Sequence, residues 1–216
     1  MTAALWNTII GAIWQTLEMT FVSGLFAYIG GLPLGIILSV TQTGGVVENK
    51  WVNQILGFIV NVGRSIPFLI LLVLLIPVTR FITGSSIGTH ATIVPLTVGA
   101  VPIVARMVES SLNEVDRGII EAARSMGASS LQTILLFIIP ESVPSLISGA
   151  AINLATILGY SAMAGVIGGG GLGAVALNYG YYRYQSDVLI VTVIILVVIV
   201  QVIQETGIKL SVLKRH

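Results

Sequence analysis

The sequence lacks cysteine and contains few charged residues. None of its 216 residues is cysteine, which excludes disulfides, thiol catalysis and cysteine-ligated metal sites. Only 9% of the residues are charged and 55% are hydrophobic, whereas roughly a quarter of the residues in an average soluble domain are charged. The mean hydropathy is +1.00, and the net charge of +1 gives no support to a nucleic-acid partner. The composition therefore predicts an integral membrane protein in contact with membrane lipid.

Motifs for ATP hydrolysis and for catalysis are also missing. A P-loop needs G-x-x-x-x-G-K-[ST], and no Gly-Lys dipeptide occurs in the chain. The only histidines, His90 and His216, have no cysteine or carboxylate cluster at metal-binding spacing. We therefore expect no catalytic residues, no metal site and no cofactor bound by this chain. The first residues contain no basic n-region, so we expect no cleaved signal peptide.

Five apolar segments are long enough to cross a bilayer, which takes about 20 residues in a helix. The last is the most apolar, with fourteen of sixteen residues hydrophobic. It is rich in β-branched residues, but lipid forces an unpaired segment to be helical. The predicted fold is all-α, a single transmembrane domain over 1–216 with five transmembrane helices. The expected spans are 19–40, 56–81, 92–108, 143–167 and 188–203.

Five spans place the termini on opposite sides of the membrane, and the distribution of Lys and Arg sets the orientation. With the N-terminus outside and the C-terminus in the cytoplasm, only Arg80 and Arg183 lie on the outside. Asn61, Arg64 and Ser65 indicate that the second span starts later, so Arg64 is assigned to neither side. The residues then placed inside are Lys50, Arg106, Arg117, Arg124, Lys209, Lys214 and Arg215.

The segment 110–140, between the third and fourth spans, is predicted to form two short cytoplasmic helices. Asp116 can cap the first helix, and Gly127 is a natural left-handed stop. Ser129 and Gln132 fit a capping box that starts the second helix. Each helix has about 10 residues, or about 15 Å, which is too short to cross a bilayer.

The second short helix is predicted to end at Pro140, because a proline disfavours helix at the residue before it. Its apolar residues recur at helical spacing and are expected to share one face. These residues are Leu131, Ile134, Leu135 and Ile138.

This segment resembles the EAA loop of ABC-importer permeases. The family pattern is Glu-Ala-Ala, three residues, Gly, nine residues and then Ile-x-Leu-Pro. Phe137 and Ile139 stand where the family has Ile and Leu, which are apolar exchanges. The resemblance implies short coupling helices that dock into a groove of a cytoplasmic ATPase, with Glu121 offering its charge and the alanines allowing close approach. The matching residues are Glu121, Ala122, Ala123, Gly127 and Pro140.

The likeness extends over nearly the whole chain. TFVSGLFAYIGGLPLG, RSIPFLILLV, VPLTVGAVPIVARMVE, GYSAMAGVIGGGGLG and YGYYRY are similar to permeases of methionine ABC importers. This resemblance implies a homodimer in the bacterial inner membrane with two ATPase subunits, which carry ATP and Mg. It also implies a lipoprotein that delivers methionine from outside, and transport by alternating access. It leaves open whether D-methionine, L-methionine or derivatives are carried.

Polar residues in the fourth span are expected to line a translocation pathway, because polar groups in lipid normally face the bundle interior. The alternatives are contacts between helices and, for Met163, filling of the core. The residues are Asn153, Thr156, Tyr160, Ser161 and Met163.

The glycine run and tyrosines after the fourth span are predicted to form a flexible outer loop that meets the delivery protein. The alternative for the tyrosines is an aromatic belt at the membrane surface. The residues are Gly170, Gly171, Tyr179, Tyr181 and Tyr182.

An ion-coupled secondary carrier for amino acids is the alternative function. Such carriers use ionisable residues inside the membrane as relays, and we find none clearly near the middle of a span. Inverted-repeat carriers also divide into matched halves, which five spans do not.

Overall fold

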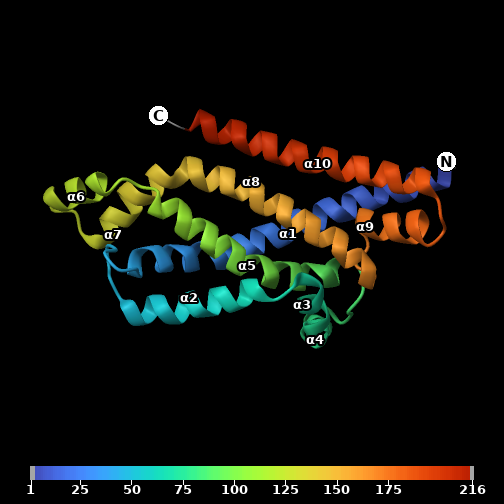
Figure 1. The fold of residues 1–216 in the computed structure, drawn as a ribbon, viewed down its shortest axis with the longest axis horizontal. Helices are drawn as coiled ribbons and strands as arrows, with labels where there is room; N and C mark the ends of the chain where they lie inside the picture. The colour runs from blue at the N-terminus through green and yellow to red at the C-terminus, as the bar shows by residue number, and fades with distance from the viewer. Residues whose placement is uncertain (1–2, 215–216) are drawn as a thin grey trace.

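The computed structural model describes residues 3–214, which form long helices lying side by side with the chain ends towards opposite ends of the bundle (Figure 1). Over this range the chain contains helices, turns and connecting segments but no β-strand. Arg215 and His216, both considered above, lie outside the described residues. The all-α prediction is confirmed for the part of the chain that the structure covers.

Four helices are long and apolar enough to cross a membrane: α1 (Ala3–Thr41), α5 (Thr89–Asn113), α8 (Ile139–Ala164) and α10 (Ser186–Leu213). A fifth span results if α2 (Lys50–Ser65) and α3 (Phe68–Leu74) count as one, although they are bent by 98°. The short helix α4 (Ile76–Thr83) follows this broken span. The β-branched segment in α10 is helical, as the absence of strand partners in lipid requires.

The second span differs most from its prediction. A single helix over 56–81 is wrong, because the chain breaks at Ile66, which has extended dihedrals (φ −78°, ψ 121°). Pro67 explains the break, since a residue before proline is driven away from helical geometry. Helix α2 begins at Lys50 and carries Arg64 in its last turn. Arg64 therefore lies within the broken span when α2 and α3 are counted as one, rather than before the start of that span.

The first span is longer than predicted, since α1 begins at Ala3 rather than near residue 19. Its inner half packs closely on α5. A Cβ added at Gly31 would lie 2.7 Å from Val104 Cβ, and one added at Gly35 would lie 2.5 Å from the Ala105 carbonyl oxygen. Small residues four apart allow two membrane helices to approach in this way.

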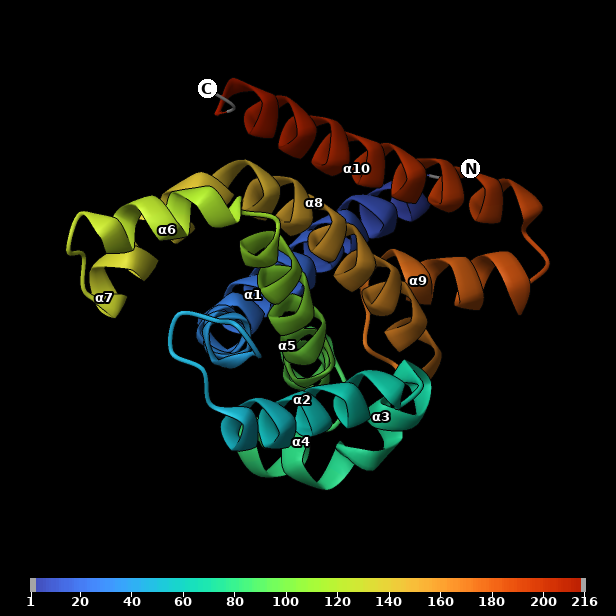
Figure 2. The same ribbon diagram turned by 60° about the vertical axis from the view of Figure 1, so that its left-hand side comes forward.

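Helix α5 occupies the centre of the bundle and packs against α1, α2 and α8 (Figure 2). Leu96, Val104 and Val108 of α5 are buried in the main core. A second cluster at the outer end contains Ile9 of α1, Val188 of α10 and Leu172 of the short helix α9 (Gly171–Val175). A 3₁₀ turn (Gly165–Ile167) precedes α9 and a π-helical segment (Ala176–Tyr181) follows it.

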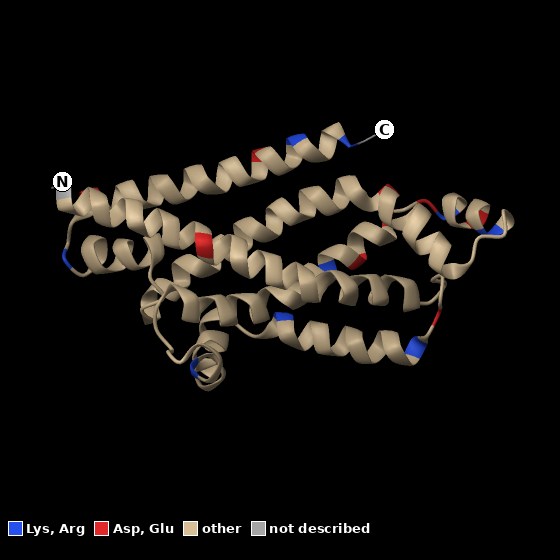
Figure 3. Cartoon of the chain, turned by 180° about the vertical axis from the view of Figure 1, so that it is seen from behind, with Lys and Arg blue, Asp and Glu red and all other residues tan. Residues whose placement is uncertain are grey.

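Charged residues are concentrated at the end of the bundle that carries α6 (Arg117–Ser125) and α7 (Ser130–Gln132), and they are sparse along its length (Figure 3). This is the end predicted to be cytoplasmic from the distribution of Lys and Arg.

Candidate functional site

The first coupling helix has the predicted ends. The Asp116 carboxylate accepts a hydrogen bond from the Gly118 backbone N–H at 2.7 Å and so caps α6. Gly127 has a φ of +81°, in the left-handed region. The Ala128 N–H donates to the Ala123 carbonyl at 3.1 Å and the Gly127 N–H donates to the Arg124 carbonyl at 2.9 Å. These two bonds form a Schellman motif, which fixes the direction in which the chain leaves α6.

The second coupling helix starts as predicted but does not end as predicted. Ser129 and Gln132 form the capping box, with bonds of 2.9 and 3.3 Å. The helix then continues through a π-helical turn (Thr133–Ile138) directly into α8. Pro140 therefore lies within a continuous helix and does not terminate one. The wider π turn explains this. The Ile139 N–H bonds to the Ile134 carbonyl in i→i+5 register. In this wider turn the ring of the following proline is less crowded by the preceding carbonyl groups than in an α-helix.

The π turn also changes which side chains face the bundle. Ile134 and Ile138 are buried, whereas Leu131 and Leu135 are exposed. The four residues predicted to share one face therefore divide into a buried pair and an exposed pair, because a π turn rotates the residues before it relative to those after it.

The residues of the EAA pattern divide into an exposed and a buried group. Glu121 and Ala122 are exposed, whereas Ala123 is fully buried in the chain itself and cannot also receive a partner. The guanidinium of Arg124 donates to the Val46 carbonyl at 3.2 Å, which ties α6 to the α1–α2 connection. No ion pair joins Arg124 to Glu121 within residues 3–214, so the Glu121 carboxylate stays available.

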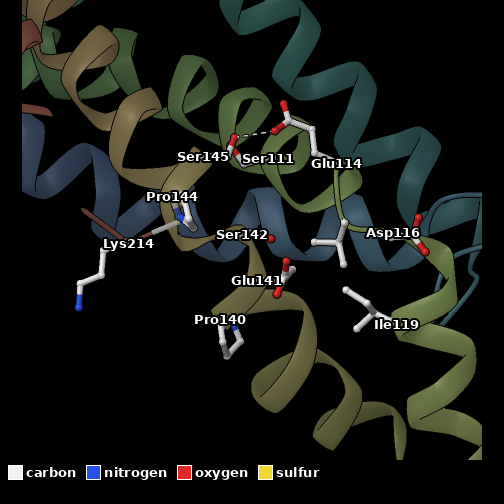
Figure 4. Close-up of a pocket in the computed structure, with 11 residues that line it drawn as sticks. Ser111, Glu114, Asp116, Ile119, Pro140, Glu141, Ser142, Pro144, Ser145 and Lys214 are labelled. Carbon is white, nitrogen blue, oxygen red and sulfur yellow. Dashed lines mark hydrogen bonds between the residues drawn. The ribbon is translucent and has the colours of Figure 1, made fainter. Parts of the chain in front are cut away.

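A polar hollow of roughly 370 Å³ lies beside the coupling helices, where α5, α6, α8 and α10 converge (Figure 4). Ser145 donates to the Glu114 carboxylate at 2.9 Å and lies 2.9 Å from the Ser111 hydroxyl. Asp116 and Glu141 also line it. Sequence reasoning missed this hollow, because its residues come from four separate helices.

The predicted pathway residues of α8 divide between the interior of the protomer and its surface. Asn153 is buried and donates to the Tyr28 hydroxyl of α1 at 3.2 Å. Ser161 is buried and donates to the Leu158 carbonyl within its own helix at 2.7 Å. Asn153 therefore joins α8 to α1, whereas Ser161 bonds only within α8, and neither residue is accessible in the protomer.

Tyr160, Thr156 and Met163 lie nearer the surface of the protomer. The Tyr160 ring stacks on Phe68 of α3, with centroids 4.3 Å apart and an interplanar angle of 5°. Thr156 is half-buried, and Met163 is 46% exposed. Met163 is therefore not core filler within this chain. Three of the five predicted pathway residues are thus accessible in the protomer.

The α5–α2 contact contains a polar network that sequence reasoning also missed. Arg106 forms an ion pair with Glu109 at 2.6 Å and donates to the Asn61 side chain of α2 at 2.8 Å. Arg64 lies on the next turn of α2 and is exposed. Within residues 3–214 it has neither an ion pair nor a side-chain hydrogen bond.

The outer glycine run turns tightly and is hydrogen-bonded to α1. Gly168, Gly170 and Gly171 have φ values of +84°, +82° and +72°, which suit glycine because it has no Cβ. The Gln15 side-chain oxygen accepts from the Gly171 N–H at 2.9 Å, and the Thr16 hydroxyl accepts from the Leu172 N–H at 2.9 Å. Two side chains of α1 therefore cap α9.

We expect Thr16→Val to destabilise the outer segment. The substitution keeps the shape but leaves the buried Leu172 N–H without its acceptor, at a cost of about 1–3 kcal/mol. The measurement is the free energy of unfolding of the purified protein in detergent. Thr8→Val is the matched control, because the Thr8 hydroxyl is exposed and bonds only within α1. Equal stability of the two variants would contradict the capping role.

The outer tyrosines differ in exposure. Tyr181 is 64% and Tyr182 is 62% exposed, whereas Tyr179 packs in the outer cluster with the Arg183 guanidinium 4.5 Å from its ring centroid. Gly171 is buried and Gly170 is half-buried.

Residues 31–205 match the family described as "binding-protein-dependent transport system inner membrane component". The chain belongs to this family. It is therefore a multi-pass inner membrane permease component rather than an enzyme, and the alternative of an ion-coupled carrier is wrong. The resemblance predicted from the EAA pattern is confirmed.

Named members of the family are similar over most of this permease. It is 50% identical over 201 residues to the probable D-methionine transport system permease protein MetI of Vibrio cholerae, covering 93% of this chain and 89% of that protein. It is 51% identical to the D-methionine transport system permease protein MetI of Salmonella typhimurium, covering 76% of each.

Solved structures give the same result for the fold of the permease. A chain of the MetNI methionine ABC transporter in inward facing conformations superposes with a TM-score of 0.98 at 45% identity, covering 100% of both chains. A chain of an amino acid ABC transporter superposes with a TM-score of 0.73 at 24% identity, covering 96% of this chain and 92% of that one, and supports the fold alone.

Proposed function

We propose that this permease forms the membrane pathway of an ATP-driven importer of methionine. The observation that carries the proposal is the likeness over the whole chain to a subunit of a methionine ABC transporter, at a TM-score of 0.98 and 45% identity. The MetI relatives, whose names specify D-methionine, support the same substrate class. Both enantiomers are therefore substrates to be tested.

The proposed assembly contains two copies of this chain and two cytoplasmic ATPase subunits. The chain has no P-loop of its own, so ATP and Mg are used in the partner. A lipoprotein that binds methionine outside the cell delivers the substrate. The close superposition on a transporter in inward facing conformations supports the view that the protomer described here has the inward-facing arrangement.

Coupling to the ATPase is assigned to the exposed part of the segment 110–140. Glu121 and Ala122 present the contact on α6, while Gly127 sets the angle between α6 and α7. Ala123 and Pro140 act within the protomer, through burial and through the continuous helix into α8. Movement of the ATPase pair would then rock α8 and α5 and open the pathway to alternate sides.

The translocation surface is assigned to the accessible side chains of α8 and α3, namely Thr156, Tyr160 with its partner Phe68, and Met163. Contact with the delivery lipoprotein is assigned to the exposed Tyr181 and Tyr182. Gly171 holds that segment against α1 through its bond to Gln15, and Gly170 lies beside the same side chain, since a Cβ added there would lie 3.0 Å from Gln15 Oε1.

ATP dependence is the direct test of this function. Cells expressing the complex are depleted of ATP while the proton gradient is kept intact, and uptake of labelled D- and L-methionine is measured. We expect uptake to stop, because the only energy source of the assembly is ATP. Persistent uptake under these conditions would contradict the proposal. Cells lacking the ATPase subunit provide the background rate.

A further inference from the structure

We propose that Arg64 binds the carboxylate of the transported amino acid inside the membrane. This inference rests on the proposed function. It names a substrate contact at the break between α2 and α3, next to the Phe68–Tyr160 stack.

The position of Arg64 along α2 places it well inside the membrane. Helix α2 begins at Lys50 on the cytoplasmic side. Arg64 lies about 21 Å further along the helix at 1.5 Å per residue, within a hydrocarbon core that is about 30 Å thick. An arginine at this depth is costly in lipid and normally faces a water-filled cavity or a partner.

The face of α2 that carries Arg64 points away from lipid. Gly57, Asn61 and Arg64 follow one another at spacings of four and three, so they share a face. Arg106 of α5 contacts the first two of these residues, with its guanidinium 2.8 Å from the Asn61 side chain. The large exposed apolar side chains of α2, which suit lipid, lie on other faces: Ile55, Phe58, Ile59 and Val62.

Arg64 extends past the end of this packed contact into a shallow hollow of the protomer. The hollow is also lined by Gly63, Gly99, Phe68 and Tyr160. Gly99 allows α3 to pack closely on α5, because a Cβ there would lie 3.1 Å from Leu71 Cδ2 and 3.4 Å from Phe68 Cδ2. The stacked Phe68 and Tyr160 rings line the hollow beside Arg64.

The charge of Arg64 is not compensated within the described chain. No carboxylate lines the hollow. The nearest acidic residue in the α2–α5 network, Glu109, is already paired with Arg106 at 2.6 Å. An unpaired guanidinium in a low-dielectric site favours an anion, and its planar donors match a carboxylate with two parallel hydrogen bonds.

An α-amino acid carries the negative charge that the lining of this hollow lacks. Its carboxylate would pair with Arg64, and its ammonium group could lie against the face or hydroxyl of Tyr160. The hollow itself is small, with a volume of roughly 10 Å³, so the amino acid would lie on the exposed side of Arg64 rather than inside the hollow. This suits a pathway, because substrate must also leave.

The test uses the complete complex of permease, ATPase and delivery lipoprotein in proteoliposomes. We compare Arg64→Lys, Arg64→Gln and Arg64→Glu with the wild type, and use Arg80→Gln of the exposed helix α4 as the control. The measurements are uptake of labelled methionine, ATP hydrolysis without methionine, and the amount of assembled complex. Hydrolysis and assembly report whether each variant is folded.

We expect uptake to fall about ten- to hundredfold in Arg64→Gln, further in Arg64→Glu, and least in Arg64→Lys. Arg80→Gln should match the wild type. A residue that only keeps the pathway hydrated would give equal rates for Gln and Glu, and that result would overturn the proposal. A wild-type rate of methionine uptake in Arg64→Gln would also overturn the proposal. Loss of assembled complex in Arg64→Lys would overturn it too, because that result would assign Arg64 a structural role.

The two proposals can fail separately. A wild-type complex that hydrolyses ATP but takes up neither enantiomer of methionine contradicts the proposed substrate. Normal methionine uptake that does not depend on the charge at position 64 contradicts only the assignment of Arg64.

Discussion

Replacing Gly127 by proline is expected to abolish methionine uptake while leaving the permease in the membrane. Gly127 has a φ of +81° at the end of α6, and proline is fixed near −65°. The Schellman bonds from Gly127 and Ala128 back into α6 would be lost. The angle between the two coupling helices would change, and with it the surface offered to the ATPase. We expect uptake to fall by at least about tenfold, equivalent to about 1.4 kcal/mol.

A graded series separates backbone conformation from side-chain size. A Cβ added at Gly127 would meet nothing within 4 Å, so the effect of Asn or Ala comes from the dihedral angle alone, whereas Pro also removes the N–H that bonds to the Arg124 carbonyl. Asn tolerates the left-handed region and should retain most activity, whereas Ala costs about 1–2 kcal/mol there. Uptake should therefore fall in the order Gly, Asn, Ala, Pro. Equal rates across the series would show that the turn does not set the coupling geometry.

The exposed charge on α6 belongs to the same prediction. Glu121→Arg leaves the fold intact, because Glu121 is exposed and makes no ion pair within residues 3–214. Combined with Gly127→Pro, it should prevent copurification of the ATPase. Glu205→Arg, which reverses an exposed charge on α10, is the matched control. Normal assembly and transport by the double variant would contradict the coupling role of this loop.

Sequence reasoning was successful where the signal is local. Asp116, Gly127 and Ser129 define helix ends through contacts with residues two to five positions away, and the sequence pattern contains all of them. The apolar length of each long helix likewise predicts a span, because lipid leaves the backbone no alternative to helix. These rules do not depend on the tertiary structure.

Sequence reasoning failed where the structure depends on contacts between distant segments, or where two local rules conflict. Pro67 breaks its span whereas Pro140 does not, because a π turn precedes Pro140. A periodicity rule assumes α-helical spacing and cannot detect that turn. The cap of α9 joins residues 156 positions apart, Gln15 to Gly171 and Thr16 to Leu172. Only the folded chain brings them together, so the sequence pattern does not reveal this cap.

Arg64 shows how the rule that charges avoid lipid can lead to a wrong helix boundary. Its charge argued against a place inside the membrane, so the span was expected to begin after it. The structure instead extends α2 from Lys50 through Arg64 and bends at Pro67. The pre-proline rule, applied to Ile66, would have found the break. A charge next to a broken helix is then a functional signal rather than a boundary marker.

The second large effect is expected at Gly173, where α9 meets the end of α8 backbone to backbone. A Cβ added at Gly173 would lie 2.6 Å from Ala162 Cα and closer still to the Ala162 carbonyl oxygen. Backbone atoms cannot move aside as a flexible side chain can, so Gly173→Ala must displace α9. Overpacking typically costs about 1–3 kcal/mol and sometimes more, and we expect the upper end of this range.

Displacement of α9 would spread through the outer cluster. Leu172 is fully buried beside Gly173, and its N–H is capped by Thr16. The exposed tyrosines that follow, proposed to meet the delivery lipoprotein, would move with it. We therefore expect Gly173→Ala to lower both the free energy of unfolding in detergent and the uptake of methionine delivered by the lipoprotein. The loss of uptake should be about tenfold or more, which corresponds to about 1.4 kcal/mol.

Gly11→Ala provides the control for Gly173→Ala, because a Cβ at Gly11 of α1 would meet nothing within 4 Å. In an exposed helical position this change should stabilise the helix by about 0.5–1 kcal/mol. Replacement by alanine should therefore change the free energy of unfolding in opposite directions at the two glycines. If Gly173→Ala retained wild-type stability and uptake, the close approach of α9 to α8 would not be what holds the outer segment in place, and the tyrosine surface would have to be positioned by α10 alone.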